Sequence, residues 1–342
     1  MATIKELSKI CGVSISTVSK ALNGYTDISE KTREKVIEKA NELGYFPNAN
    51  ARSLKLKKTF NIGVLFETPS PLGLRNDYFA HILSAFKEEC SLRGYDITFV
   101  EHYVGRRKMT YLEHCQYRQF DGVCVVCADY KNEEVVELVQ SQIPVVTIDF
   151  AFQKAYSIIS DNYNGMKELT EYIIDMGHKK IAYIHGIKTL VTENRIDGFC
   201  ETLEKNNIKI PKEYIVQGKY RDPIGAEKLA VELLELADAP TCIIAPDDHS
   251  ALGVISAVGR KGLKIVEDIS IAGYDGAEVP YFIGIKLTTV SQDKERIGVT
   301  SARKLIEMIE SSSGVSHDTV FVEQTFIKGN SIRSIKSSDG IG

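Results

Sequence analysis

The sequence lacks any apolar run long enough to cross a membrane, and its opening residues, MATIKELSK, are not a signal peptide. It also lacks internal repeats and low-complexity segments. Three motifs of common enzymes are missing as well, namely G-x-S-x-G, the P-loop lysine motif and H-E-x-x-H. We therefore expect a chain that has no membrane contact, is not an enzyme, and uses neither a cofactor nor a metal.

The seven cysteines are an odd number and are scattered along the chain, which favours a reduced, cytoplasmic setting over a disulfide framework. Cys124 and Cys127 form a C-x-x-C motif, which in another context would suggest metal or redox chemistry. They lie inside DGVCVVCA, which is typical of a buried strand, and residues three apart in a strand point to opposite faces. We therefore expect two core cysteines.

Charge is divided unevenly along the 342 residues, a length that allows more than one domain. Residues 1–58 hold 11 Lys and Arg against 6 Asp and Glu, whereas the remaining residues hold 31 against 40. A small basic head on an acidic body indicates that the head meets an anion and that the body does not.

Three short amphipathic helices are predicted in the basic head. Thr3 and Glu6 form a capping box for the first helix. Ser14 is placed to cap a second helix, Ile15–Leu22, and the third helix begins near Ser29. The residues expected to face inward are Ile4, Leu7, Ile10, Val18, Ala21, Leu22, Val36, Ala40 and Leu43.

Two short helices joined by a glycine turn and braced by a third are typical of a helix-turn-helix. With its apolar residues buried, the second helix exposes Ile15, Ser16, Ser19 and Lys20. Hydroxyls can bond base edges or phosphates, and lysine can bond guanine or phosphate, so this face is suited to reading DNA. The alternative is an ordinary solvated helix in a small bundle, which has the same periodicity.

The stretch TIKELSKICGVSISTVSKALNG closely resembles the amino-terminal signature of the lactose/galactose-repressor (LacI/GalR) family of bacterial transcription regulators, above all in G-V-S-x-x-T-V-S-[RK]-x-L-N. The departures are mild, such as Lys20 for the commoner arginine. The resemblance implies that Ile15, Ser16 and Lys20 face the major groove, with Ile15 suited to a thymine methyl group. It further implies that Ser14 and Thr17 hold phosphates.

The segment FPNANARSLKLKKT, taken alone, is typical of a basic, solvated linker. The resemblance implies instead that residues 47–59 fold into a hinge helix only on operator DNA, where one such helix per subunit enters the minor groove. Leu54 matches the residue that wedges between base pairs. Arg52 and Lys55 would then lie near the minor groove or the phosphates, and Lys57 would neutralise phosphate.

From Phe60 onward, strands alternate with amphipathic helices, which predicts parallel sheets covered by helices on both faces. The predicted strands are FNIGVLF, YDITFVEH, FDGVCVVCA, IPVVTID, YSIIS, KIAYIHG, YIVQG, TCIIAP, ISIAGYD and TTVSQ. The clearest helices cover residues 78–93, 163–176, 224–237 and 249–261. So many strands exceed one compact open sheet, so we expect two lobes, with the chain crossing near Asp149–Ser160 and Thr289–Asp293.

The sequence thus predicts an all-α helix-turn-helix head in residues 1–46, a hinge in residues 47–59, and an α/β two-lobed body of doubly wound parallel sheets in residues 60–329. Residues 330–342 are polar and are predicted to form a disordered tail. The tail has no leucine heptads that would build a tetramer.

Ligands of doubly wound folds bind beyond the carboxyl ends of the strands. The polar and aromatic candidates at those positions are Tyr78, Phe79, Asp149, Phe150, Arg195, Tyr220, Asp247 and Asp275. Each alone could equally be a helix cap or a surface charge, but the group together predicts a binding site. Asp247 and Asp275 could also be taken for the paired carboxylates of a sugar-processing enzyme, an interpretation that the head argues against.

The body also resembles the family's effector domain, which is similar to periplasmic sugar-binding proteins, in GHKKIAYIHG, in R-x-x-G-F at Arg195–Phe199, and in DISIAGYDG. The resemblance assigns the family's arginine and final aspartate to Arg195 and Asp275, while Asp247 stands where many members have asparagine. Carboxylates, an arginine and aromatic rings suit a mono- or oligosaccharide. Purine-binding members carry a second arginine in the loop before the first, and KTLVTEN has none.

These features predict a sequence-specific repressor that binds palindromic double-stranded operator DNA as a homodimer and responds to a small effector, first of all a sugar. The alternative is a two-lobed sugar-binding module or enzyme whose head does not bind DNA. A mobility-shift assay against the DNA upstream of the protein's own operon separates the two.

Overall fold

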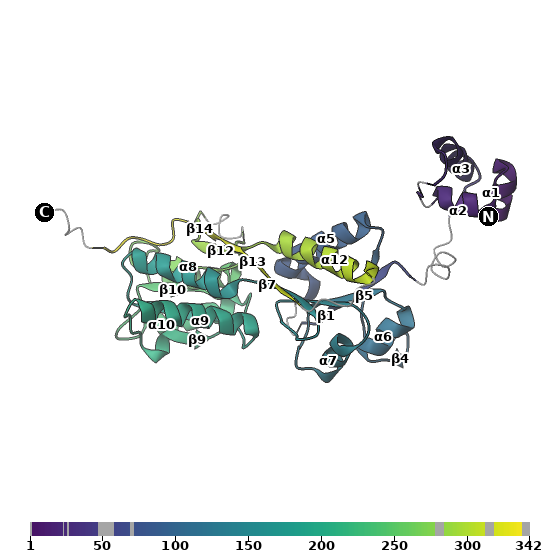
Figure 1. Cartoon of the computed structure of the whole chain (residues 1–342). Coiled ribbons are helices and arrows are strands. Elements are labelled where there is room, and N and C mark those ends of the chain that lie inside the picture. Colours follow the sequence, from purple (N-terminus) through teal and green to yellow (C-terminus); the bar gives the residue numbers. More distant parts are fainter. Residues whose placement is uncertain are drawn as a thin grey trace. The chain divides into compact units, whose positions relative to one another are not determined.

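The computed structural model describes residues 2–22, 24–25, 27–46, 58–68, 72–277, 284–311 and 318–336. The chain divides into two compact units, Met1–Phe60 and Asn61–Gly342 (Figure 1). The predicted hinge contacts Arg52, Leu54, Lys55 and Lys57 lie outside the described residues. Among the described residues, no helix combines the length and the apolar character needed to span a membrane.

In the described residues of the first unit there are three helices, α1 (Ile4–Cys11), α2 (Ile15–Leu22) and α3 (Glu30–Glu42), as the sequence predicted. The capping box of Thr3 and Glu6 is confirmed. Ser14 starts α2, because its hydroxyl accepts the backbone N–H of Thr17 at 3.0 Å.

The core of this unit differs from the predicted one at two positions. Leu7, Cys11, Val18, Ala21, Val36 and Ala40 are buried together. Ile10 was predicted to face inward but is 50% exposed, because Cys11, four residues after Leu7, takes the core position on α1. Leu43 is also exposed, since α3 ends at Glu42 and Leu43 is only its C-cap.

The second unit has two lobes, as predicted. The first lobe holds a six-stranded sheet in the order β13-β7-β6-β5-β1-β2, in which every neighbouring pair is parallel. Its strands are β1 (Asn61–Phe66), β2 (Asp96–Phe99), β5 (Gly122–Cys127), β6 (Val145–Ile148), β7 (Tyr156–Ser160) and β13 (Thr319–Val322). Its helices are α5 (Asp77–Leu92), α6 (Tyr111–Arg118), α7 (Glu133–Gln140) and α12 (Lys294–Glu310). Helices α5 and α12 pack side by side (Figure 1).

The second lobe holds a four-stranded parallel sheet in the order β11-β10-β8-β9. Its strands are β8 (Ile181–His185), β9 (Ile215–Gln217), β10 (Cys242–Ile244) and β11 (Ser270–Ala272). Its helices are α8 (Asn162–Asp175), α9 (Leu190–Lys205), α10 (Pro223–Leu234) and α11 (Asp248–Arg260). Short elements complete the unit, namely η1 (Gly73–Arg75), η2 (Lys212–Tyr214), and the hairpin strands β3 (Tyr103–Val104) and β4 (Arg107–Lys108).

The described chain passes between the lobes at three places, one more than predicted. The first passage follows β7, and the second follows β12 (Thr289–Gln292) and leads into α12. The third joins β13, in the first sheet, to β14 (Gln324–Ile327), which pairs antiparallel with β12. The sequence prediction missed β13 and β14 because each is only four residues long and its apolar run is shorter still.

The prediction that a disordered tail starts at residue 330 is wrong, because the following residues pack against the second lobe. Ser331 and Ile332 are buried, and the hydroxyl of Ser331 donates to the carbonyl of Ile271 at 2.6 Å. The backbone N–H of Ile335 donates to the carbonyl of Met176 at 2.8 Å. A polar segment therefore packs against the second lobe because its backbone and hydroxyl groups find partners there. Residues 337–342 lie outside the described part.

The C-x-x-C motif lies in β5, as the sequence predicted. Cys124 is fully buried and Cys127 is half-buried. Burial raises the pKa of the Cys127 thiol to about 12, so it stays protonated at neutral pH. Among the described residues, no group of three or more His, Cys, Asp or Glu side chains is arranged to hold a metal ion.

Candidate functional site

The outer face of α2 carries the side chains that were predicted to meet DNA. Ile15 and Ser16 are exposed at its first turn, and the buried residues of the helix are Val18 and Ala21. The hydroxyls of Ser14 and Thr17 lie 2.8 Å apart in a mutual hydrogen bond. The helix thus presents one apolar side chain and several hydroxyl groups on the side away from its core.

Lys20, the cation of this face, is not isolated. Its ammonium group donates to the carboxylate of Asp27, in the loop between α2 and α3, and this bond lowers the pKa of Asp27. Both side chains are largely exposed, so the pair is open to exchange with another anion. Sequence reasoning missed Asp27 because it lies in a loop, where no helical periodicity links it to Lys20.

In the first lobe, Tyr78 and Asp149, two of the candidates grouped by their positions after strands, meet. The phenol of Tyr78 donates to Oδ2 of Asp149 at 2.6 Å. The backbone N–H of Ser160 donates to Oδ1 of Asp149 at 3.3 Å. Burial raises the pKa of Asp149, although both of these hydrogen bonds act in the opposite direction. Asp149 also has a left-handed backbone, with φ of 59°, of the kind found at functional sites.

Aromatic rings lie next to both residues in the sequence and pack against other rings. Phe79 packs edge-on against Tyr78, with ring centroids 5.1 Å apart. Phe150 stacks on Tyr130, with centroids 4.5 Å apart and planes at 12°. Sequence reasoning missed Tyr130, which lies in the loop after β5 and donates its hydroxyl to the carbonyl of Ile148 at 2.7 Å.

In the second lobe, Arg195 is the centre of a polar network. It lies in the first half of α9 and is only 2% exposed. Its Nε donates to Oδ1 of Asn162 at 2.8 Å, its Nη1 to the carbonyl of Pro246 at 3.2 Å, and its Nη2 to Oδ1 of Asp275 at 3.4 Å. A buried guanidinium with each nitrogen directed at an acceptor has a fixed position before any ligand arrives.

Asp275 is the partly accessible member of this network, with 21% of its side chain exposed. Gln292 donates to its Oδ1 at 2.5 Å, and Lys294 donates to its backbone carbonyl at 2.7 Å. Its backbone is left-handed, with φ of 95°. Tyr220 is also close to Arg195, with its ring centroid 5.6 Å from the guanidinium carbon. Its hydroxyl lies 2.8 Å from the hydroxyl of Thr192.

The clusters of the two lobes act on each other electrostatically. The pKa of Tyr78 is raised well above its usual value, first by burial and then by the charge of Asp149. Asp275 in the second lobe raises it further, and the cation of Arg195 opposes the shift. Tyr78 and Asp149 of the first lobe therefore lie within electrostatic range of Arg195 and Asp275 of the second.

Asp247 has a different place from the other candidates. It caps α11 and is only 1% exposed. Its Oδ1 accepts the backbone N–H of Ser250 at 2.8 Å, and its Oδ2 accepts the backbone N–H of Arg221 at 2.7 Å and the hydroxyl of Ser250 at 3.0 Å. Both carboxylate oxygens are thus engaged within the second lobe, which is the helix-cap alternative that the sequence had left open.

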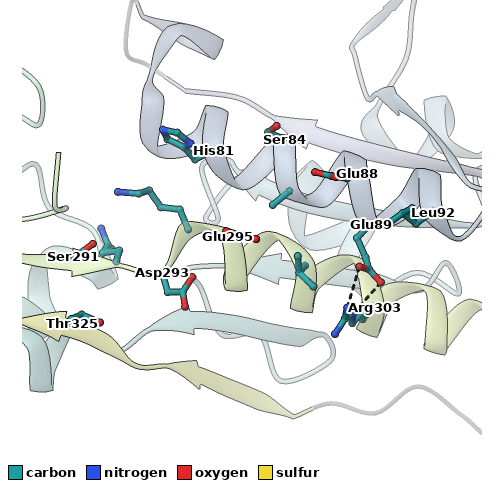
Figure 2. A pocket seen from close by; sticks show the side chains of 14 residues that line it. His81, Ser84, Glu88, Glu89, Leu92, Ser291, Asp293, Glu295, Arg303 and Thr325 are labelled. Carbon is teal, nitrogen blue, oxygen red and sulfur yellow. Dashed lines mark hydrogen bonds and ion pairs between the residues drawn. The ribbon is translucent and has the colours of Figure 1, made fainter. Parts of the chain in front are cut away.

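A groove with a volume of about 750 Å³ lies elsewhere, between α5, α12 and the end of β12. Figure 2 shows Glu89 on α5 paired with Arg303 on α12, which lowers the pKa of Glu89. The groove includes none of the predicted effector residues. It adjoins them through Gln292 and Lys294, which also bond Asp275, and through Ser291, which forms a β-bridge with Asp275.

Comparison with known proteins covers both units of the chain. Residues 3–48 match the family described as bacterial regulatory proteins, lacI family, and residues 170–332 match a periplasmic binding protein-like domain. The chain is 32% identical over 340 residues to the HTH-type transcriptional repressor PurR of Histophilus somni strain 129Pt, covering 98% of this chain and 100% of that protein. The PurR repressor of Pasteurella multocida strain Pm70 is 34% identical over 318 residues, covering 92% and 93%.

Among solved structures, the lac repressor dimer bound to operator and the anti-inducer ONPF is similar over 97% of this chain and 99% of that one. Its TM-score is 0.78 and its sequence identity 25%. The likeness extends over the head as well as the two-lobed body, so the combination of the two units is shared and not only the fold of each.

Proposed function

The chain belongs to the LacI family of bacterial regulatory proteins, and on that premise we propose that it is a homodimeric repressor whose operator affinity is set by a ligand bound between its lobes. It is a DNA-binding transcriptional repressor of this family. The class of ligand, the dimeric state, and the residues that contact DNA or ligand are part of the proposal. So are the cytoplasmic setting and the limits of the head and the hinge, residues 1–46 and 47–59.

The observation that carries the proposal is the exposed face of α2. A helix with Ile15 and Ser16 outward, hydroxyls at its start and a lysine near its end has the donors and the apolar contact that a major groove can accept. Lys20 would exchange Asp27 for a base edge or phosphate. The hydroxyls of Ser14, Thr17 and Ser19 would form hydrogen bonds with the phosphates and the adjoining bases.

For the ligand, Tyr78, Asp149, Arg195 and Asp275 offer hydrogen-bond acceptors beside a fixed cation. Carboxylates that accept hydroxyl donors, with Phe79, Phe150 and Tyr220 nearby for ring faces, suit a sugar. Purine bases are the second class to test, because the relatives that span the whole chain carry the repressor name PurR. Asp247, whose two carboxylate oxygens are engaged within the second lobe, would support the site and not contact the ligand.

The relatives favour the repressor over a binding module or enzyme with a head of another purpose, because they match the head together with the body. Dimerisation through the body would place two heads on a palindrome, since one helix-turn-helix makes too few contacts for useful specificity. Sedimentation should show a dimer at micromolar concentration. A monomer both with and without operator would contradict this part.

The main test uses fluorescence anisotropy with the DNA upstream of the protein's own operon and a scrambled control. Specific binding should exceed binding to the scrambled duplex by on the order of a thousandfold. A thermal-shift screen over sugars and purine bases then identifies the ligand class, because a ligand that binds the folded state raises the melting temperature. Equal affinity for both duplexes would contradict the repressor function. A melting temperature that no sugar and no purine base changes would contradict both proposed ligand classes.

A further inference from the structure

One ion pair joins the two lobes beside the proposed ligand site. Arg221, in the second lobe after β9, donates from Nη1 to Oδ1 of Asp77, the first residue of α5 in the first lobe. Asp77 directly precedes Tyr78, and Arg221 directly follows Tyr220. The pair therefore lies next to one candidate ligand contact from each lobe.

The backbone of Arg221 is held in an unusual conformation. Its φ is 55°, in the left-handed region that residues other than glycine seldom adopt. The bond from its N–H to the buried carboxylate of Asp247, at 2.7 Å, fixes this turn. The next backbone N–H, of Asp222, donates to the hydroxyl of Ser250 at 3.2 Å. A conformation that costs energy and is held by buried partners indicates a function for the side chain it directs.

The guanidinium of Arg221 is also supported from the side. The two ring nitrogens of His249, on α11, each lie 3.2 Å from one of its terminal nitrogens. Nε2 of His249 is 3.8 Å from Oδ2 of Asp77. The side chain of Arg221 is 16% exposed and that of Asp77 41%, so the arginine is largely desolvated while the carboxylate is reachable.

We propose that Arg221 and Asp77 form a clamp that holds the lobes together over the ligand site, with Asp247 and His249 as the residues that position Arg221. The role of the clamp in ligand control rests on the proposed function, but its existence does not. An exposed ion pair contributes little because both side chains lose conformational freedom in forming it. Here the side chain of Arg221 is largely buried with His249 beside its guanidinium, so it has less conformational freedom to lose.

Hydrogen exchange by mass spectrometry on the full chain, without ligand or DNA, tests the clamp directly. Amides next to the clamp, in residues 75–82 and 217–223, should exchange faster when the lobes part, because the segments that carry them lose the support of the ion pair. Asp77→Asn should speed exchange about three- to tenfold in residues 217–223, in the lobe that it does not alter. Arg221→Gln should do the same in residues 75–82. The double variant should be no faster than either single variant, because both remove one interaction.

Matched charge-conserving variants separate a clamp from general damage. Asp77→Glu and Arg221→Lys should recover much of the protection, and exchange in α7, remote from the clamp, should stay unchanged in every variant. Salt at about 1 M should speed exchange in the native chain and leave Asp77→Asn unaffected. Exchange that rises only in the lobe carrying the substitution would overturn the proposal. Because neither ligand nor DNA is present, that result is independent of any failure of the proposed repressor function.

Discussion

The guanidinium carbon of Arg195 lies 3.6 Å from the ring centroid of Tyr274, so the cation is stacked on an aromatic face while its nitrogens reach three acceptors. A stacked, desolvated cation of this kind is strongly held. The hydroxyl of Tyr274 in turn donates to Gln324 on β14, a strand beside the third passage between the lobes. The proposed ligand contact is thereby linked to a segment that joins the lobes.

Substituting Arg195 should separate ligand response from DNA binding. Arg195→Ala leaves Asn162 and Asp275 without their cation, so the free energy of unfolding should fall by about 2–4 kcal/mol. The ligand found by the screen should no longer change operator affinity, while ligand-free operator binding changes little. Arg195→Lys keeps the charge without the planar fork and should be intermediate. Urea denaturation, calorimetry and anisotropy measure these three effects. A full ligand response in Arg195→Ala would place the ligand elsewhere.

Asp149 should give the body a distinct pH dependence. Because burial raises its pKa in the folded state, its contribution to the free energy of unfolding is complete below the unfolded pKa, about 3.8, and is lost as pH rises through the folded value. Asp149→Asn removes this titration. The stability of the variant relative to the native chain should therefore increase between about pH 4 and neutrality. Urea midpoints across that range measure the slope, and a constant difference would contradict the raised pKa.

The head could be predicted closely from the sequence because its signals are local. A capping box at Thr3 and a serine at position 14 fix where two helices begin, and a period of three to four residues gives most of the core. At Ile10 the prediction was wrong because the neighbouring Cys11 occupies the core position. At Leu43 it was wrong because α3 ends one residue earlier. Both outcomes depend on tertiary packing. The pairing of Lys20 with Asp27 is likewise set by the loop and not by helical spacing.

In the body, the sequence pattern predicted two lobes and most strands but not which candidates meet. Strand ends gather at one edge of a parallel sheet, and this rule grouped Tyr78, Asp149, Arg195 and Asp275 as candidates. That Tyr78 bonds Asp149 and Arg195 bonds Asp275 is seen only in the structure. The rule gives no information on the direction of a side chain. It therefore grouped Asp247 with the ligand contacts, and it missed Arg221, whose direction depends on a left-handed turn.

Substitutions at Lys20 and Asp27 should affect DNA binding in opposite directions. Lys20→Ala should cost about 1–3 kcal/mol on the operator and change sequence preference, because a base contact is lost. Asp27→Asn frees Lys20 and removes an anion near the DNA, so binding to all duplexes should tighten. Lys57→Ala, outside the described residues, is the comparison: it should weaken all sequences alike and reduce the salt slope by about one. Anisotropy at several salt concentrations measures these changes. Equal effects of Lys20→Ala and Lys57→Ala on cognate and scrambled DNA would contradict the assignment.

Asp247→Asn should be costly although asparagine caps helices as well as aspartate does. The amide oxygen can replace Oδ1 and accept the N–H of Ser250. The amide nitrogen then replaces Oδ2 and presents a donor to the N–H of Arg221, which is itself a donor. A largely buried N–H that loses its acceptor costs about 1–3 kcal/mol, so urea denaturation should show a loss of that size.

Asp222→Asn is the matched control, because Asp222 caps α10 by accepting the N–H of Gly225 at 2.9 Å with one oxygen only. Asparagine can keep that bond, so the control should cost less than about 0.5 kcal/mol. If the carboxylate of Asp247 is needed to hold Arg221 and not merely to start a helix, the two variants must differ. Equal costs would mean that Asp247 acts only as a cap, and Asp77 would then have to be the residue that holds Arg221 in place.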